Sequence, residues 1–212
     1  VSFAVNFSEG IVEATKKLKQ LAKGAKVIEV PDGEPLFLFS TVVGKTRPLN
    51  CFYDRGCSHV VWKTGVPQVE LEAVKTREGP LKMHTAGDNT VTVGDEWACL
   101  VNMMDGSKQV MVGVDCNKIT STFPRIKTGA AMKEIMKKCP QKIRNTISKL
   151  KVPDIVGGDP DILLGIHYEA CHPEVLHTLD SGLFVAKLKL ASSSGYTACI
   201  GGPHKSFAFL AD

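Results

Sequence analysis

Two stretches of the sequence decide the fold: CFYDRGCS at residues 51–58 and PDILLG at residues 160–165. In the first stretch an apolar strand pattern ends at Asp54, and Gly56 follows two residues later. Glycine lets the main chain turn tightly and approach a partner closely. The second stretch contains a short apolar run that also ends in glycine, at Gly165. We therefore expect Asp54 to stand on a tight turn, with the later apolar run forming a wall behind it.

Strand patterns extend over the centre of the chain on both sides of Asp54. Segments rich in Val, Ile, Phe and Thr alternate with Gly, Pro, Asn and Asp clusters, which is typical of an all-β barrel or sandwich. The segments predicted as strands are 27–30, 36–43, 47–53, 60–62, 69–74, 81–84, 90–93, 97–101, 109–114, 162–168, 183–190 and 196–200.

Two other segments have helical periodicity. Apolar residues recur at helical spacing between Ser8 and Gly24, and again between Ala130 and Leu150. Pro140 interrupts the second segment, where it either kinks one helix or begins another. The sequence thus predicts a mainly β fold with flanking α-helices.

The composition excludes several classes of protein. A chain of 212 residues with 43% hydrophobic residues can bury a sizeable core, and its net charge of +4 is dispersed, so nucleic acid is not expected as a partner. Seven cysteines without close pairing predict a reducing, cytoplasmic location. No apolar run approaches the roughly 18 residues of a membrane span, so no membrane partner is expected.

The two stretches resemble the active-site motif and the hydrophobic-hydrophobic-Gly motif of retropepsin-like aspartic proteases, especially those in polyproteins of Bel/Pao-type long-terminal-repeat retrotransposons. The resemblance covers about residues 35–204 and includes, in the family's order, His172-Pro173, Gly182-Leu183 and a closing segment at residues 201–204. It implies a retropepsin-like (acid protease) closed β-barrel. The implied domains are an N-terminal helix and lead-in strand at 1–33, a retropepsin-like domain at 34–204 with a helical insertion at about 129–151, and a tail at 205–212.

The same resemblance implies a function. The chain would be an aspartic endopeptidase that processes a retrotransposon polyprotein as a homodimer, each copy supplying one aspartate, without metal or other cofactor. Asp54 would be the catalytic carboxylate on a loop with Arg55 and Gly56. The flap that covers a peptide substrate would include Gly87, Asp88, Asn89 and Thr90, and the supporting wall would be Leu163, Leu164 and Gly165.

Arg55 departs from the family pattern, which has Ser or Thr at this position. That hydroxyl ties the two active-site loops together across the dimer, and a guanidinium, which only donates hydrogen bonds, cannot replace it. An alternative function is therefore a catalytically inactive dimerisation or peptide-binding module of the same fold. A third hypothesis is an unrelated β-barrel interaction domain, in which Asp54 lies far from Leu163–Gly165.

Other chemistry-bearing residues offer weaker sites. Asp180-Ser181-Gly182 spells the family tripeptide but follows a polar segment. Cys57 with His59, and Cys171 with His172, place metal-binding side chains near each other without the knuckle spacing of structural zinc sites. Pairs separated by suitable helical spacing are His167 with Cys171 and His172 with His177. We predict that these side chains are buried thiols and surface histidines. A Cys57 nucleophile paired with a distant histidine is possible in principle, but nothing local in the sequence supports it.

Overall fold

The computed structural model describes residues 34–36, 38–85 and 89–204, all within one compact unit, Asp32–Asp212. The predicted helix between Ser8 and Gly24, the predicted strand 27–30 and the tail 205–212 lie outside the described residues. The described part is mainly β, as the sequence predicts.

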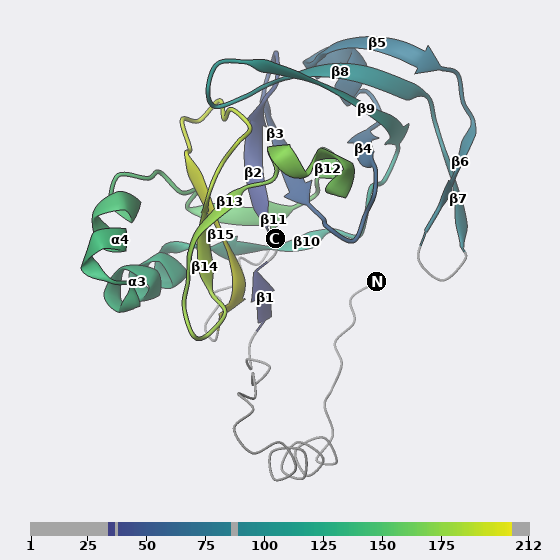
Figure 1. The fold of residues 1–212 in the computed structure, drawn as a ribbon. Coiled ribbons are helices and arrows are strands. Elements are labelled where there is room, and N and C mark those ends of the chain that lie inside the picture. Colours follow the sequence, from purple (N-terminus) through teal and green to yellow (C-terminus); the bar gives the residue numbers. More distant parts are fainter. Residues whose placement is uncertain (1–33, 37, 86–88, 205–212) are drawn as a thin grey trace, which may run out of the picture. The chain divides into compact units, whose positions relative to one another are not determined.

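The largest element is a seven-stranded sheet (Figure 1). Its strands, in spatial order, are β2 (Phe39–Val43), β3 (Pro48–Tyr53), β12 (Ile162–Leu164), β4 (Val60–Lys63), β9 (Lys108–Cys116), β8 (Glu96–Asn102) and β5 (Glu72–Arg77). The three-residue strand β12 lies between β3 and β4, parallel to the first and antiparallel to the second. Two strands that are neighbours in sequence are thus separated by one that comes about a hundred residues later.

Three smaller sheets complete the β structure. A four-stranded sheet has the order β1 (Glu34–Leu36), β15 (Ala198–His204), β14 (Phe184–Lys187) and β13 (Glu174–Thr178). Two antiparallel pairs make up the other sheets: β10 (Phe123–Lys127) with β11 (Ile155–Gly158), and the hairpin of β6 (Leu81–His84) with β7 (Thr90–Val93).

The expected closed β-barrel is not formed by the described residues. The seven-stranded sheet ends at β2 and β5, which do not pair with each other, so it stays open. The last three strands form their own sheet with β1 instead of closing the larger one. The chain between Leu36 and Phe39 separates β1 from β2, so the predicted continuous strand 36–43 is two short strands in different sheets.

The helices in the described part of the chain are short. They are α2 (Val66–Glu70), α3 (Gly129–Lys138), α4 (Gln141–Ile147) and the 3₁₀ helix η1 (Ile166–Cys171). Pro140 separates α3 from α4, so it precedes a second helix and does not kink a single one. No helix in the described ranges is long and apolar enough to cross a membrane.

Two further predicted strands overlap with helices. Residues 69 and 70 of the predicted strand 69–74 belong to α2, because Pro67 occupies the first turn of that helix, where its missing N–H costs no hydrogen bond. The predicted strand 162–168 ends at Leu164, and η1 follows directly.

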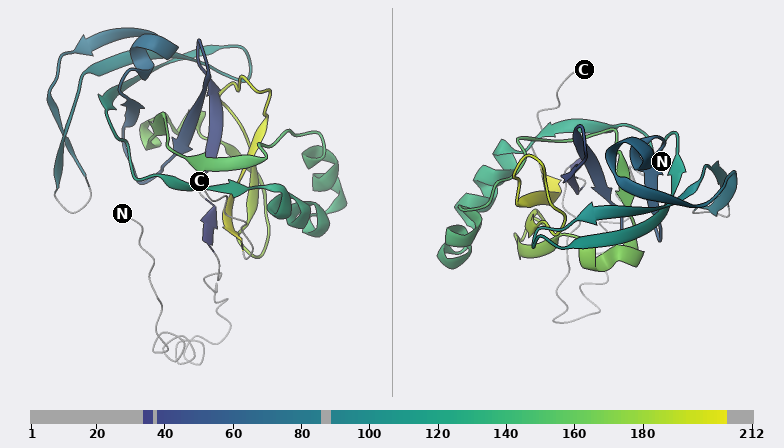
Figure 2. Two further views of the ribbon diagram at one scale, coloured as in Figure 1. Left: turned by 180° about the vertical axis from the view of Figure 1, so that it is seen from behind. Right: turned by 90° about the horizontal axis from the view of Figure 1, so that it is seen from above.

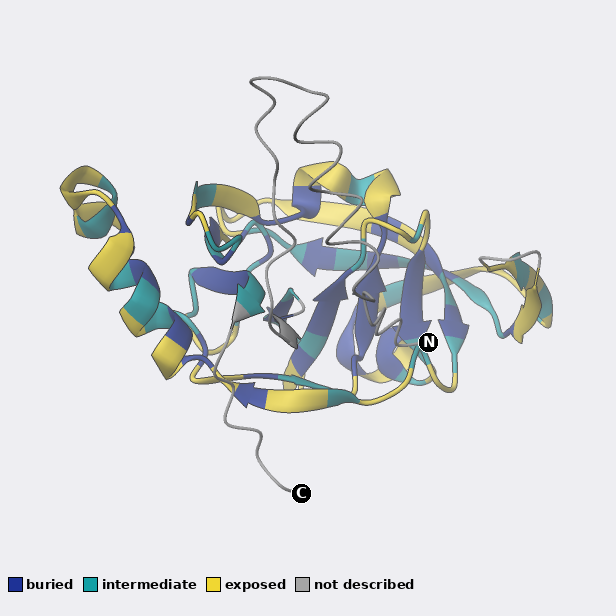
Figure 3. Cartoon of the chain, turned by 90° about the horizontal axis from the view of Figure 1, so that it is seen from below, coloured by how far each residue is buried: buried dark blue, intermediate teal, exposed yellow. Residues whose placement is uncertain are grey.

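The centre of the strand trio β3, β12 and β4 is buried on both faces, since its side chains are divided between two hydrophobic cores. Figure 3 shows in dark blue that the buried residues gather on the central strands. Leu163 faces a core that includes Val185 and Ile200 of the four-stranded sheet, together with helix α3. Ile162 and Leu164 face the opposite core, which contains large side chains such as Trp62, Trp97 and Met111. A strand covered on both faces needs apolar residues at every position, which explains the unbroken Ile-Leu-Leu run.

Asp161 anchors the start of β12 through charged and main-chain hydrogen bonds. Its side chain is 8% exposed and accepts two hydrogen bonds from the Arg47 guanidinium, both at 2.8 Å, and one from the Asn50 N–H at 2.9 Å. Its own main chain bonds to Asn50 O and Lys63 N–H, each at 2.8 Å. Burial acts to raise the pKa of Asp161, but the hydrogen bonds from Arg47 and Asn50 outweigh it and lower the pKa below its ordinary value.

We predict that Asp161→Asn lowers the free energy of unfolding by about 1–3 kcal/mol at neutral pH, because it removes a buried acceptor from Arg47 and Asn50. A carboxyl group with a lowered pKa in the folded state stabilises the protein above its unfolded pKa and loses that effect as the pH falls through the folded value. The difference between wild type and variant should therefore shrink below about pH 4.

Urea titrations at neutral and acidic pH measure this difference. Asp105→Asn is the control, since Asp105 also has a lowered pKa but bonds only to the neighbouring Ser107 in an exposed turn. An Asp161→Asn protein as stable as the control at neutral pH would contradict the anchoring role.

Candidate functional site

Asp54 stands at the end of β3 on a tight, partly exposed turn. Its carbonyl accepts a hydrogen bond from the Cys57 N–H at 3.2 Å, and its Oδ1 accepts one from the Gly56 N–H at 2.8 Å. A Cβ on Gly56 would lie 3.1 Å from that Oδ1, which is tighter than ordinary contact. The turn therefore fixes one carboxylate oxygen of Asp54.

The predicted wall lies directly beside this turn. The Asp54 N–H donates to Leu164 O at 3.1 Å, which extends the pairing of β3 with β12 by one residue. On the other side of β12, Leu164 pairs with Val60 at the start of β4. The structure thus brings Asp54, Leu163 and Leu164 together, which does not fit the hypothesis that Asp54 lies far from Leu163–Gly165.

Gly165 packs against the main chain of the same loop. A Cβ at this position would lie 2.4 Å from His59 O and 2.6 Å from Cys57 O, both of them main-chain atoms. The next residue, Ile166, donates its N–H to Cys57 O at 2.8 Å. Only glycine allows the end of β12 to come this close to the loop that follows Asp54.

His172 supports Gly165 from the interior, a contact that sequence analysis did not predict. This histidine is 4% exposed, and its Nε2 is 3.0 Å from Gly165 O, so Nε2–H is the donor. Its ring meets Tyr53 edge-on at 5.5 Å between centroids, and the Tyr53 hydroxyl bonds to Ser40 Oγ at 2.8 Å. The sequence signal for this role is the His-Pro pair at 172–173. Its sequence pattern indicates a family motif and a possible metal ligand, but not this contact.

The Arg55 side chain bonds to η1. Its guanidinium Nη2 donates to Glu169 Oε1 at 2.9 Å, and both side chains are more than half exposed. Among the described residues no ion pair joins Arg55 to Asp54. An exposed pair of this kind adds little to stability, typically about 0–1 kcal/mol. Its effect is to hold the guanidinium of Arg55 against η1.

The predicted flap corresponds to the hairpin of β6 and β7, which extends away from the seven-stranded sheet in Figures 1 and 2. Asn89 closes its described part, accepting a hydrogen bond from the Thr85 N–H at 2.7 Å, and Thr90 begins β7 with an exposed side chain. Gly87 and Asp88 lie outside the described residues.

Asp180 is placed differently from Asp54. It lies in the tight turn between β13 and β14, where the Leu179 N–H bonds to Leu183 O at 2.8 Å and the Gly182 N–H to Leu179 O at 2.8 Å. The polar segment before it does form a strand, β13, which sequence analysis did not predict. No later strand inserts beside this turn, as β12 does beside Asp54.

The cysteines offer no activated thiol at the Asp54 loop. Burial raises the pKa of Cys57, and the charge of Asp54 adds to this rise, whereas a main-chain hydrogen bond from His59 opposes it. A thiol with a raised pKa stays protonated and is a poor nucleophile. Cys171 and His172 are both buried, and the described residues contain no group of three or more side chains suited to hold a metal ion.

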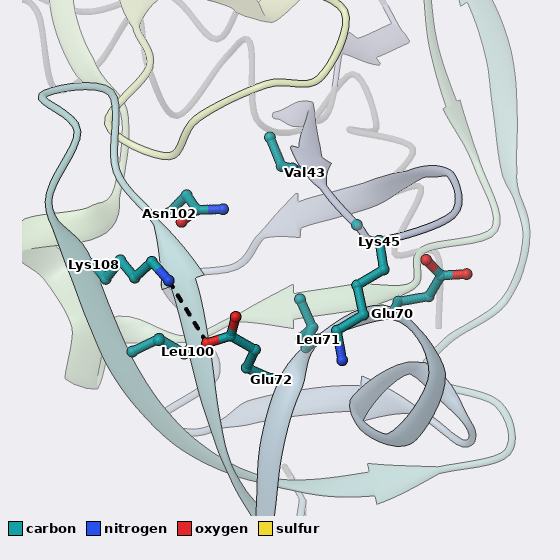
Figure 4. Close-up of a pocket in the computed structure, with 9 residues that line it drawn as sticks. Val43, Lys45, Glu70, Leu71, Glu72, Leu100, Asn102 and Lys108 are labelled. Carbon is teal, nitrogen blue, oxygen red and sulfur yellow. Dashed lines mark ion pairs between the residues drawn. The ribbon is translucent and has the colours of Figure 1, made fainter.

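A separate pocket lies on the edge of the seven-stranded sheet, between β2, α2, β5 and β8 (Figure 4). Lys45, Leu71 and Leu100 line it, and the Lys108 ammonium lies 3.6 Å from a Glu72 carboxylate oxygen at its rim. None of its lining residues belongs to the Asp54 turn or to the wall. Polar groups, a tight turn and a supporting strand come together at Asp54 and not at this pocket. We therefore treat the Asp54 loop as the candidate site.

We predict that Gly165→Ala destabilises the protein by about 1–3 kcal/mol, because the new methyl group meets main-chain oxygens that cannot move independently. The matched control is Gly129→Ala: a Cβ there has nothing within 4 Å, and Gly129 opens helix α3. The control should be neutral or slightly stabilising, by up to about 1 kcal/mol. Thermal unfolding of both variants compares them, and equal melting temperatures would contradict the close approach.

Comparisons of the chain with protein-family models, with curated proteins and with solved structures found no match. The geometry of the Asp54 loop is therefore the observation on which a function can be argued.

Proposed function

We propose that the chain is an aspartic endopeptidase with a retropepsin-like fold, in which Asp54 acts with Asp54 of a second copy. The observation that carries the proposal is the position of β12 between β3 and β4, which puts Leu164 O against the Asp54 N–H at 3.1 Å. An aspartate turn backed by an inserted apolar strand is the pairing that the resemblance implies. The substrate would be an extended peptide, such as a retrotransposon polyprotein.

In the proposed reaction two carboxyl groups lie close enough to share one proton, because two like charges at short range cannot both ionise readily. The ionised Asp54 takes a proton from a water molecule, which attacks the carbonyl carbon of the peptide bond. The protonated Asp54 of the other copy donates its proton to the carbonyl oxygen. The turn at Gly56 supports this role, since its N–H holds one oxygen of Asp54 in place.

The proposal requires a homodimer, since the chain has one aspartate on such a turn among its described residues. The flap would be the β6–β7 hairpin, with Asn89 and Thr90 on its described part. We further propose a reducing, cytoplasmic environment. All seven cysteines are free thiols, and five of them are buried.

A second candidate function is a catalytically inactive module of the same fold that dimerises or binds peptides. Arg55 favours it, because its guanidinium has no hydroxyl to link two active-site loops and is instead bonded to Glu169 at 2.9 Å. The two candidates share the fold, and they differ in whether peptide bonds are cleaved.

We predict that Asp54→Asn lowers the rate of peptide cleavage by about 10²–10⁴-fold, the usual contribution of a general acid or base. Arg55→Ser should raise the rate, because it restores a hydroxyl at the loop. The measurement is cleavage of a mixed peptide library from mildly acidic to neutral pH, with products identified by mass spectrometry.

The matched control is Asp180→Asn, which removes a carboxylate from an exposed turn of another sheet and should leave cleavage unchanged. Cleavage that survives Asp54→Asn but not Asp180→Asn would overturn the assignment. A wild type without cleavage activity, together with an active Arg55→Ser variant, would establish the inactive module. Sedimentation of a monomer at all concentrations would rule out the protease.

A further inference from the structure

Two histidine side chains from different parts of the chain lie side by side next to the Asp54 loop. His59 precedes β4, and His167 is the second residue of η1. Their ring centroids are 5.2 Å apart, the ring planes are inclined by 55°, and both residues are exposed. The proposed reaction uses neither imidazole, so this pair needs a separate explanation.

The main chain beneath the pair is fixed before any ligand arrives. The His167 N–H donates to Ser58 O at 3.2 Å, next to the bond from Ile166 to Cys57 O. The close approach of Gly165 to the same loop adds a steric constraint. Because the two segments are held together by these contacts, little main-chain entropy would be lost when both imidazoles bind one ligand.

One nitrogen of His59 is already oriented by its neighbour. Its Nδ1 lies 2.5 Å from Ser58 Oγ, which can accept the Nδ1–H and leaves Nε2 with a lone pair. A hydrogen bond to the second ring nitrogen is the usual outer partner of a histidine that binds metal. The ring of His167 has no hydrogen bond of its own among the described contacts.

The separation of the rings suits a shared ion. With Zn–N distances of about 2.0–2.1 Å and tetrahedral angles, the centroids of two imidazoles on one ion lie about 5 Å apart. Imidazole nitrogen is a good ligand for Zn²⁺ and other late transition metals and a poor one for Mg²⁺. The distance of 5.2 Å matches this separation, and both rings are exposed and so accessible to an ion.

We propose that His59 and His167 form a two-imidazole site for a divalent transition-metal ion, with Zn²⁺ as its probe. The described residues contain no cluster of three metal-binding side chains, so water completes the coordination of the ion. Cys57 is close in sequence, but its thiol donates to His59 O at 3.4 Å and is not part of the site. The site is independent of the proposed protease function.

The test is a titration of the folded chain with Zn²⁺ against a chromogenic chelator, with thiols kept reduced. The wild type should bind one ion per chain, and His59→Asn and His167→Asn should each weaken binding by at least about tenfold. His177→Asn and Cys57→Ser are matched controls that should bind as the wild type does. Mg²⁺ should not compete.

Substitution with Co²⁺ gives a readout of ligand type. With Co²⁺ bound, the wild type should show visible absorption bands but no thiolate charge-transfer band. The visible bands should be absent from the double variant His59→Asn/His167→Asn. Loss of Zn²⁺ binding in Cys57→Ser, or binding that persists in the double variant, would overturn the proposal. So would a wild type that binds no Zn²⁺, since the histidines would then form only a ring contact. Circular dichroism of each exposed-site variant confirms that it is folded.

Discussion

The insertion of β12 between β3 and β4 is the constraint on which the described structure depends. Three residues supply main-chain pairing to two strands at once and side chains to two hydrophobic cores. The ends of this strand are held in different ways: Asp161 is bonded to Arg47 and Asn50 at one end, whereas Gly165 is pressed against the main chain at the other. The position of Asp54 and the contact between His59 and His167 both follow from this arrangement.

Sequence patterns predicted the strands that carry strong apolar signals. The segments around β3, β4, β8 and β9 were confirmed, because their residues are buried on at least one face. Strands β10 and β11 were missed, since they are short, contain Pro124 or paired glycines, and find their partner some thirty residues away. The prediction of a closed barrel was wrong for a related reason. Closure depends on which edges meet, and local periodicity carries no information about that.

The candidate site was predictable only in part. Asp54 and the Leu-Leu-Gly run each carry a local signal, an apolar strand that ends in a glycine turn, and the structure brings them together. The contacts of His172 with Gly165 and of Arg55 with Glu169 have no local signal in the sequence, because they join residues from separate elements. Whether a histidine is a buried donor or an exposed ligand depends on the packing around it, which single positions in a sequence do not reveal.

The same insertion affects the order in which the protein can fold. Cys51 pairs with Ile162, so more than a hundred residues must be synthesised before the turn at Asp54 gains its backing strand. Contacts this distant in sequence form late, because the entropy of closing the loop is lost before the contact contributes its energy. A nascent chain released from the ribosome before Gly165 would carry Asp54 on an unsupported hairpin. The geometry of the candidate site is therefore acquired only after the chain has been synthesised through β12 and Gly165.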